Sequence, residues 1–128
     1  MKNQTDKKIL VVDDDESIRI LLDRVIGTIN RASAVLASNV NEGIAFFSKN
    51  KIDLIITDLN MPSETGLILL SKVKEKNPNI PVIIFSGSLN EEERSKANEM
   101  EADMILAKPC EVSTLKQIIS DLLFPKPR

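Results

Sequence analysis

Polar side chains that could carry out chemistry stand at the ends of several apolar runs in this sequence. Directly after the run ILVV come Asp13, Asp14, Asp15 and Glu16. Clustered carboxylates repel one another, so this group costs stability unless water, a helix N-terminus or a cation offsets the repulsion. Three further apolar runs end on the pairs Thr57-Asp58, Ser86-Gly87 and Lys108-Pro109.

The residue types in the chain narrow the chemistry that these positions can perform. There is no histidine, and Cys110 is the single cysteine, so neither a cysteine-based zinc site nor a histidine base is expected. Carboxylate oxygens are ligands that Mg²⁺ prefers, and the ion would offset the repulsion. A phosphoryl group is its natural second ligand, because the metal and a lysine neutralise phosphoryl oxygens while a hydroxyl donates to one of them. An Asp carboxylate can then act as the nucleophile and form an aspartyl phosphate.

The elements that must position these groups follow from the alternation of short apolar runs with longer amphipathic segments, which predicts βα units. The predicted strands are nearly continuous in apolar residues, as is typical of strands covered on both faces. They span residues 9–12, 34–37, 52–57, 82–85 and 104–107. Apolar residues at helical spacing predict helices over residues 18–29, 41–49, 67–76 and 112–123. A further helix is expected over residues 91–100, where only Ala97 and Met100 offer an apolar side, so this helix should be weakly anchored and the most mobile element.

Five strands joined by helices predict an α/β domain with a doubly wound, five-stranded parallel sheet. The flavodoxin-like (βα)5 topology with strand order 2-1-3-4-5 is the usual arrangement for this size. We expect an N-terminal tail over residues 1–8, one domain over 9–124, and a tail or the start of a linker over 125–128. In open α/β sheets ligands bind outside the carboxyl ends of the strands, so the polar positions should meet at one edge.

Motifs in four places resemble those of response-regulator receiver domains. They are VVDD at residues 11–14, DLNMPSETG at 58–66 with the pattern D-x-x-M-P-x-x-x-G, FSGS at 85–88 and KP at 108–109. They occur in the family's order, each at the end of a predicted strand, and the resemblance runs from Ile9 to about Leu123. The chain is thus similar to a receiver of two-component signalling over nearly its whole length.

The resemblance implies that Asp58 accepts a phosphoryl group from a phosphohistidine. The donor would be a sensor histidine kinase or a histidine phosphotransfer protein. Mg²⁺ would be bound by Asp13, Asp14, Asp58 and the backbone carbonyl of Asn60. Such a domain catalyses its own phosphorylation and dephosphorylation and is not a turnover enzyme. Phosphorylation would switch the surface of the fifth strand and its flanking helices, and thereby control an output partner or a separate output domain.

The resemblance also implies roles for Ser86 and Lys108, whose hydroxyl and ammonium groups would stabilise the phosphoryl group, and a cis bond before Pro109, which fits the small trans preference of proline. Ser86 would move as part of the family's switch. Three residues before Lys108, where many receivers carry an aromatic residue or histidine that rotates, this chain has Ile105. An aliphatic side chain cannot reproduce that rotation, so the conformational response to phosphorylation is expected to differ.

Three other positions are also of note. Thr65 stands before the motif's glycine, where the family often has an acidic residue, but this position lies outside the chemistry. Asn60 and Ser88 occupy positions that tune the lifetime of the phosphoryl group in the family. The presence of Asn and Ser at these positions sets no value for that lifetime.

Charge and hydropathy exclude other classes of function. Nineteen acidic against seventeen basic residues give a net charge of -2, and no basic run exceeds Lys7-Lys8, so we expect no direct nucleic-acid contact. No apolar run approaches the roughly 18 residues of a membrane span, and the N-terminus lacks the apolar stretch of a signal peptide. We therefore expect a cytoplasmic protein without membrane contact, either monomeric or dimeric on phosphorylation.

Each acidic position has an alternative interpretation. Asp14, Asp15 and Glu16 could cap the helix that follows, a role worth roughly 0.3–1 kcal/mol for each group, and Asp58 could be a turn residue. The pair Asp13-x-Asp15 resembles the nucleophile and general acid of haloacid-dehalogenase-type phosphatases, although that family usually needs more than 128 residues. Ile105 favours a third possibility, a receiver-like interaction domain that works without phosphorylation.

Overall fold

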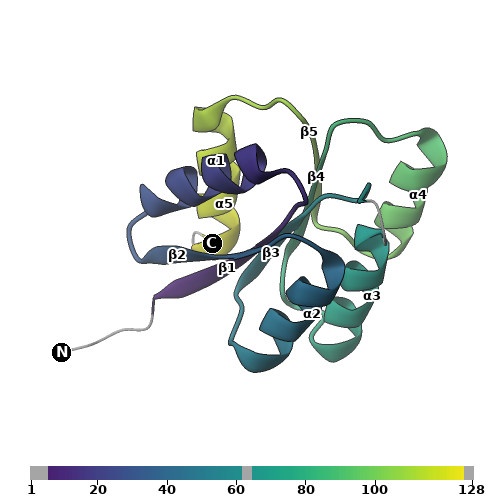
Figure 1. The fold of residues 1–128 in the computed structure, drawn as a ribbon, viewed down its shortest axis with the longest axis horizontal. Coiled ribbons are helices and arrows are strands. Elements are labelled where there is room, and N and C mark those ends of the chain that lie inside the picture. Colours follow the sequence, from purple (N-terminus) through teal and green to yellow (C-terminus); the bar gives the residue numbers. More distant parts are fainter. Residues whose placement is uncertain (1–5, 62–64, 126–128) are drawn as a thin grey trace.

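The computed structural model describes residues 6–61 and 65–125 and shows a parallel sheet between two layers of helices (Figure 1). The strands are β1 (Lys7–Val12), β2 (Ala32–Ala37), β3 (Leu54–Thr57), β4 (Val82–Ser86) and β5 (Met104–Ala107). They pair in the order β2-β1-β3-β4-β5, which confirms the predicted topology. Strand β1 is therefore flanked by β2 and β3, and the ends of β1, β3 and β4 lie side by side.

The helices divide between the two faces of the sheet. They are α1 (Glu16–Gly27), α2 (Val40–Lys49), α3 (Gly66–Lys76), α4 (Glu91–Glu99) and α5 (Val112–Leu123). Helices α1 and α5 cover one face, whereas α2, α3 and α4 cover the other (Figure 1). Strands β3 and β4 and residues 9–12 of β1 are consequently buried on both sides, which explains their continuous apolar runs in the sequence.

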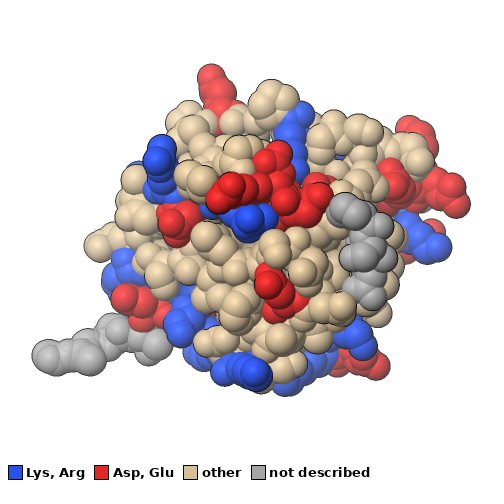
Figure 2. Space-filling model, in the orientation of Figure 1, with Lys and Arg blue, Asp and Glu red and all other residues tan. Residues whose placement is uncertain are grey.

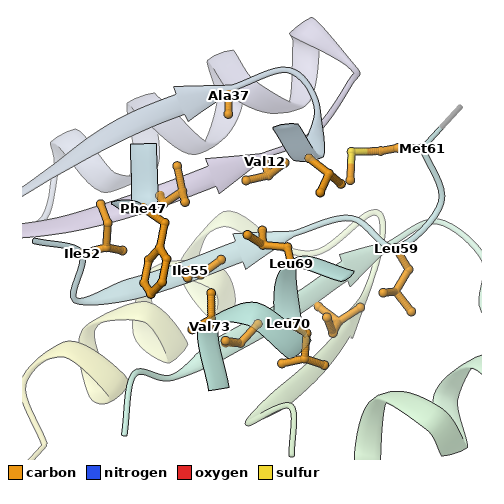
Figure 3. Packing of buried hydrophobic residues seen from close by; sticks show 14 of the residues in the cluster. Val12, Ala37, Phe47, Ile52, Ile55, Leu59, Met61, Leu69, Leu70 and Val73 are labelled. Carbon is orange, nitrogen blue, oxygen red and sulfur yellow. The ribbon is translucent and has the colours of Figure 1, made fainter. Parts of the chain in front are cut away.

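Alternate residues of β1 enter the two separate cores. Leu10 and Val12 pack with α2 and α3, whereas Ile9 and Val11 pack with α1 and α5. Figure 3 shows the first of these cores, in which Phe47 from α2 and Leu69, Leu70 and Val73 from α3 lie against the sheet. Burial of large aliphatic side chains at roughly 1.5–3 kcal/mol each makes these two layers the main source of stability.

Several boundaries differ from those predicted. Strand β1 begins at Lys7 rather than at residue 9, and β2 begins at Ala32 rather than at residue 34. Lys7 and Ala32 are partners in the ladder, because backbone pairing continues where the side chains face solvent and need not be apolar. Strand β3 begins at Leu54, although Ile52 is buried and packs in the core just before it.

Helix α4 is attached to the rest of the domain by few apolar side chains. Ala97 is its one fully buried residue, while Met100, at the C-cap, is half-buried. Its beginning is instead fixed by polar contacts, since Asn90 accepts from the Glu93 N–H at 2.7 Å and the Glu93 carboxylate accepts from the Asn90 N–H at 3.0 Å. The weak apolar anchoring predicted for this segment is confirmed, and its mobility stays a prediction.

The described helices are all too short or too polar to cross a membrane.

Candidate phosphoryl-acceptor site

The polar residues that follow β1, β3, β4 and β5 meet at the carboxyl edge of the sheet. The Lys108 Nζ donates to Asp13 Oδ2 at 2.8 Å and to Asp58 Oδ2 at 3.1 Å. The Ser86 hydroxyl donates to Asp58 Oδ1 at 2.9 Å. Figure 2 shows acidic side chains gathered over this edge, close to the end of β1. The structure therefore brings together four residues, and the hydrogen-bonded pairs among them are 28 to 95 positions apart in the sequence.

The Asp58 carboxylate is held in a narrow, mostly buried position at the end of β3. The carboxylate accepts a hydrogen bond from the backbone N–H of Asn60 at 3.0 Å. The backbone N–H of Asp58 donates to the Val12 carbonyl at 3.1 Å. The backbone of Gly66 passes so close that a Cβ there would lie 2.3 Å from the Asp58 carbonyl oxygen. A glycine is required at this point because any side chain would push the backbone of residue 66 away from that of Asp58.

Burial and charge act in opposite directions on the site. Asp13 is 2% exposed, and this burial raises the pKa of its carboxyl group, although hydrogen bonds from Lys108 and from the Asp15 N–H oppose the rise. Burial by itself lowers the pKa of Lys108, but the hydrogen bonds and charges of Asp13 and Asp58 outweigh it, so the pKa of Lys108 is raised overall. Lys108 is therefore charged at neutral pH and offsets part of the carboxylate repulsion.

Three carboxylates at this edge form a possible metal site. Oxygen atoms of Asp13, Asp14 and Asp58 all lie within 4.8 Å of one another. Asp13 and Asp58 are buried, whereas Asp14 is exposed to solvent, so an ion held here keeps a side open to water. This set of hard oxygen donors fits Mg²⁺. The Asn60 N–H donates to Asp58 Oδ1, and the Asn60 carbonyl as a further ligand of the ion stays a prediction.

The other two acidic residues of the cluster belong to the start of α1. Asp15 is the N-cap, and its Oδ1 accepts the N–H of Ser17 at 2.9 Å and the Ser17 hydroxyl at 2.7 Å. These hydrogen bonds lower the pKa of Asp15. Glu16 occupies the first turn. The capping interpretation is thus confirmed for Asp15, and its carboxylate is engaged by the helix rather than offered as the general acid of a phosphatase.

Two contacts at the site were missed by the sequence reasoning. The Arg19 Nη1 donates to the Asp13 carbonyl at 2.7 Å, and the Asn60 side chain donates to the Ser88 carbonyl at 2.9 Å. The first fixes the turn that presents Asp13, and the second joins the loops that follow β3 and β4. Both acceptors are backbone carbonyls, which no pattern of side chains in a sequence reveals.

The turn after β5 has the backbone geometry that the family resemblance implied. The Lys108–Pro109 peptide bond is cis, and the Lys108 N–H donates to the Ser86 carbonyl at 2.9 Å. Ile105 pairs with Ile84 in the sheet and is half-buried against the core on the side of α2, α3 and α4. In Figure 1 the turn after β5 leads across the edge of the sheet to α5.

Comparisons with known proteins agree with this geometry. The model of the response regulator receiver domain family matches residues 9–120. The chain is 28% identical over 121 residues to the autoinducer 1 sensor kinase/phosphatase LuxN of Vibrio campbellii, covering 94% of this chain and 14% of LuxN. It is 29% identical over 120 residues to the regulator of RpoS of Escherichia coli, covering 93% of this chain and 35% of that protein.

Among solved structures, the chemotaxis protein CheY4 of Vibrio cholerae superposes with a TM-score of 0.85 at 26% identity, covering 93% of this chain and all of CheY4. The chain spans about a third or less of the two curated relatives named above. With the family model covering most of the residues and the strand order shared, this chain belongs to the response-regulator receiver domain family.

Proposed function

We propose that this receiver domain takes a phosphoryl group on Asp58 in a Mg²⁺-dependent reaction. The observation that supports the proposal most strongly is the contact of Asp58 with both Ser86 and Lys108, at 2.9 and 3.1 Å. A hydroxyl and an ammonium group next to one buried carboxylate are the donors that a transferred phosphoryl group needs. A carboxylate that served only as a turn residue would not require this hydroxyl and this ammonium group beside it.

The reaction is an exchange of one bond at phosphorus for another. A carboxylate oxygen of Asp58 attacks the phosphorus atom of a phosphohistidine, the new O–P bond forms as the P–N bond breaks, and the electron pair of that bond leaves with the donor's imidazole. Lys108 neutralises phosphoryl oxygens, and the Ser86 hydroxyl donates to one of them. Dephosphorylation is a separate step in which a water oxygen attacks phosphorus and gives up a proton to solvent, while the O–P bond to Asp58 breaks, so that inorganic phosphate leaves and the Asp58 carboxylate is regenerated.

Asp13, Asp14 and Asp58 would hold the Mg²⁺ ion, with the carbonyl of Asn60 as a further ligand. When bound, the ion supplies positive charge that stabilises the phosphoryl oxygens in the transition state. Lys108 already offsets part of the same carboxylate charge, being hydrogen-bonded to Asp13 and Asp58. Asp14, which is exposed, gives the site access from solvent.

The partner that donates the phosphoryl group is proposed to be a sensor histidine kinase or a histidine phosphotransfer protein. LuxN is named as a sensor kinase/phosphatase, and this chain resembles a part of it. On phosphorylation Ser86 would leave the Asp58 carboxylate for the phosphoryl group and shift the loop after β4, changing the surface of β5, α4 and α5 that an output partner contacts, or through which the domain dimerises.

The proposal is tested by the intact mass of the protein after incubation with acetyl phosphate. We expect one added phosphoryl group in the wild type with Mg²⁺, and none in EDTA or in Asp58→Asn. Asp23→Asn serves as the control, because Asp23 is an exposed aspartate of α1 outside the acidic cluster. An unmodified wild type, or a modified Asp58→Asn protein, would refute Asp58 as the acceptor.

A second candidate function is binding without phosphorylation, which Ile105 favours because the half-buried aliphatic side chain cannot swing as an aromatic one does. Amide exchange with and without beryllofluoride, a phosphoryl mimic, separates the two functions. A phosphorylation switch changes protection within residues 86–110. Equal protection, at a beryllofluoride concentration that saturates the site, would leave only the binding function.

A further inference from the structure

A cavity lies at the edge of the sheet opposite to Asp58. It is a hollow open to solvent with a volume of about 440 Å³. Its walls are the ends of α2 and α3, the segment 50–53 before β3 and the loop before β4. Phe47, Ile52 and Ile80 provide apolar surface, and Figure 3 shows the Phe47 ring beside Ile52. The volume falls within the range of about 300–1,000 Å³ that is common for small-molecule sites.

The wall of the cavity is positively charged although the whole chain is acidic. Lys49, Lys51 and Lys76 line it and are exposed, whereas Asp53 is the one carboxylate among its lining residues. The Asp53 Oδ2 accepts the N–H of Lys8 at 2.9 Å, so part of its hydrogen-bonding capacity is already used. Figure 2 shows basic side chains along the lower edge, below α2 and α3, in contrast to the acidic side chains at the other edge.

Helix dipoles would work against an anion here, because α2 and α3 both end at the cavity. A carbonyl in the last turn of α2 and two carbonyls in the loop after α3 already accept hydrogen bonds from side chains. The Asn50 side chain donates to the Phe46 carbonyl at 3.0 Å, and the Lys74 Nζ donates to the carbonyls of Pro78 and Ile80 at 3.3 and 2.9 Å. The three lysines that line the cavity therefore have to outweigh Asp53 and the two helix ends, each of which carries roughly −0.5 charge.

Lys76 is held at the cavity wall by an aromatic ring. Its Nζ lies 5.7 Å from the centroid of the Phe47 ring, within the range of a cation–π contact. Asn77 and Asn79 add amide groups to the same wall. Ammonium groups, amides and a patch of apolar surface around one hollow make a combination suited to a ligand that carries both phosphate charge and an organic part.

We propose that this cavity binds a small organic phosphate of nucleotide size. The phosphates would contact Lys49, Lys51 and Lys76, and the organic part would lie against Phe47, Ile52 and Ile80. Lysines in the last turns of α2 and α3 would stabilise those helices without any ligand, but this explains neither Lys51, which lies outside both helices, nor the hollow between them. The site is independent of Asp58 phosphorylation.

The test is a titration of ¹⁵N-labelled protein with ATP, followed by the amide resonances. EDTA is present throughout, so that no Mg²⁺ can bring the nucleotide to the acidic edge. We expect saturable shifts confined to residues 47–53 and 76–80, with affinity about tenfold weaker in the double variant Lys51→Gln/Lys76→Gln, since two charge-assisted contacts are lost. Lys116→Gln, which removes an exposed lysine of α5, should bind as the wild type does.

Pyrophosphate and adenosine serve as further probes, and both should bind more weakly than ATP because each lacks one half of the ligand. Pyrophosphate binding as tightly as ATP would overturn the organic part of the proposal, and adenosine binding as tightly would overturn the phosphate part. Shifts that persist in the double variant, or no saturation in the millimolar range, would overturn the site altogether. None of these outcomes bears on phosphorylation of Asp58, which the intact mass reports separately.

Discussion

At the scale of single residues, the site consists of a carboxylate whose two oxygens are bound by different partners. Asp58 Oδ1 accepts from Ser86 and from the Asn60 N–H, while Oδ2 accepts from Lys108. Charge-assisted hydrogen bonds of this kind fix a side chain more firmly than neutral ones. In the proposed reaction these contacts would orient the nucleophile before any phosphoryl donor arrives and so lower the entropic part of the barrier.

Asp13 should destabilise the domain when no metal is bound. Because burial raises the pKa of its carboxyl group in the folded protein, the folded state binds this proton more tightly than the unfolded state does. The destabilisation of the folded state by Asp13 is absent below the pKa of this carboxyl group in the unfolded chain. It grows as the pH rises from that value to the pKa in the folded protein, and it is complete above the folded pKa. We therefore expect Asp13→Asn to raise the thermal midpoint in EDTA at pH 7 by a few degrees.

The measurement for Asp13 is a series of thermal unfolding curves in EDTA at several pH values. The gain from Asp13→Asn should shrink as the pH is lowered through the titration of the carboxyl group. Asp23→Asn provides the matched control, since this exposed residue of α1 stands apart from the cluster. A lower midpoint for Asp13→Asn at pH 7 would show that the pairing of Asp13 with Lys108 outweighs the cost of burial.

At the scale of elements, the loops at the carboxyl edge are placed by local backbone requirements. Thr65 caps α3 through its hydroxyl, which accepts the Leu67 N–H at 3.2 Å, and Gly66 follows where the chain passes the Asp58 carbonyl. The threonine that departs from the family pattern is thus a helix cap. The backbone of Asp58 and the first turn of α3 therefore form one closely packed unit.

A methyl group at Gly66 should be costly, whereas the same change at Gly27, on the other face of the sheet, should not be. A Cβ at Gly66 would lie 2.3 Å from a backbone oxygen, and one at Gly27 has nothing within 4 Å. We expect Gly66→Ala to lower the free energy of unfolding by about 1–3 kcal/mol, and Gly27→Ala, at the end of α1, to raise it by about 0.5–1 kcal/mol. Urea unfolding curves compare the two, and equal effects would contradict the close approach at Gly66.

Helix α4 depends on its cap more than on its packing. Removing the cap with Asn90→Ala should cost roughly 1 kcal/mol within the helix. Because only Ala97 is fully buried there, we expect faster amide exchange over residues 91–99 with little change in global stability. Exchange that accelerates throughout the domain would instead show that α4 unfolds together with the core.

The elements differ in how far the sequence could predict them. The prediction that four residues lie at one edge was correct, because the carboxyl ends of parallel strands lie at the same edge of the sheet. These residues are Asp13, Asp58, Ser86 and Lys108. The first residue of β1 was missed, since the pairing of Lys7 with Ala32 is a backbone property. The Asn60–Ser88 contact and the lysine-lined cavity bring together residues from different loops, and no local pattern specifies such distances.

At the scale of the whole molecule, charge is divided between the two edges of the sheet. Carboxylates gather at the edge where the strands end, and lysines line the hollow at the other edge. A domain of this size with two complete cores, one on each face of the sheet, has little need of a ligand to fold. Metal binding can therefore be studied apart from folding.

Mg²⁺ should stabilise the folded domain, because an ion that binds only the folded state shifts the unfolding equilibrium by mass action. At a concentration one hundred times the dissociation constant the gain is about 2.7 kcal/mol. We expect the thermal midpoint to rise with Mg²⁺ in the wild type and to stay constant in Asp14→Asn, which removes the exposed ligand of the cluster. An equal rise in both proteins would place the ion elsewhere.

The central claim, that Asp58 and no other carboxylate accepts the phosphoryl group, is tested most directly by borohydride reduction of the phosphorylated protein followed by peptide mass spectrometry. Borohydride converts an aspartyl phosphate to homoserine and leaves free carboxylates unchanged, so the modified residue is identified in place. We predict homoserine at position 58 only, and only when Mg²⁺ was present. Homoserine at position 13 would contradict the account and would favour Asp13 as the nucleophile.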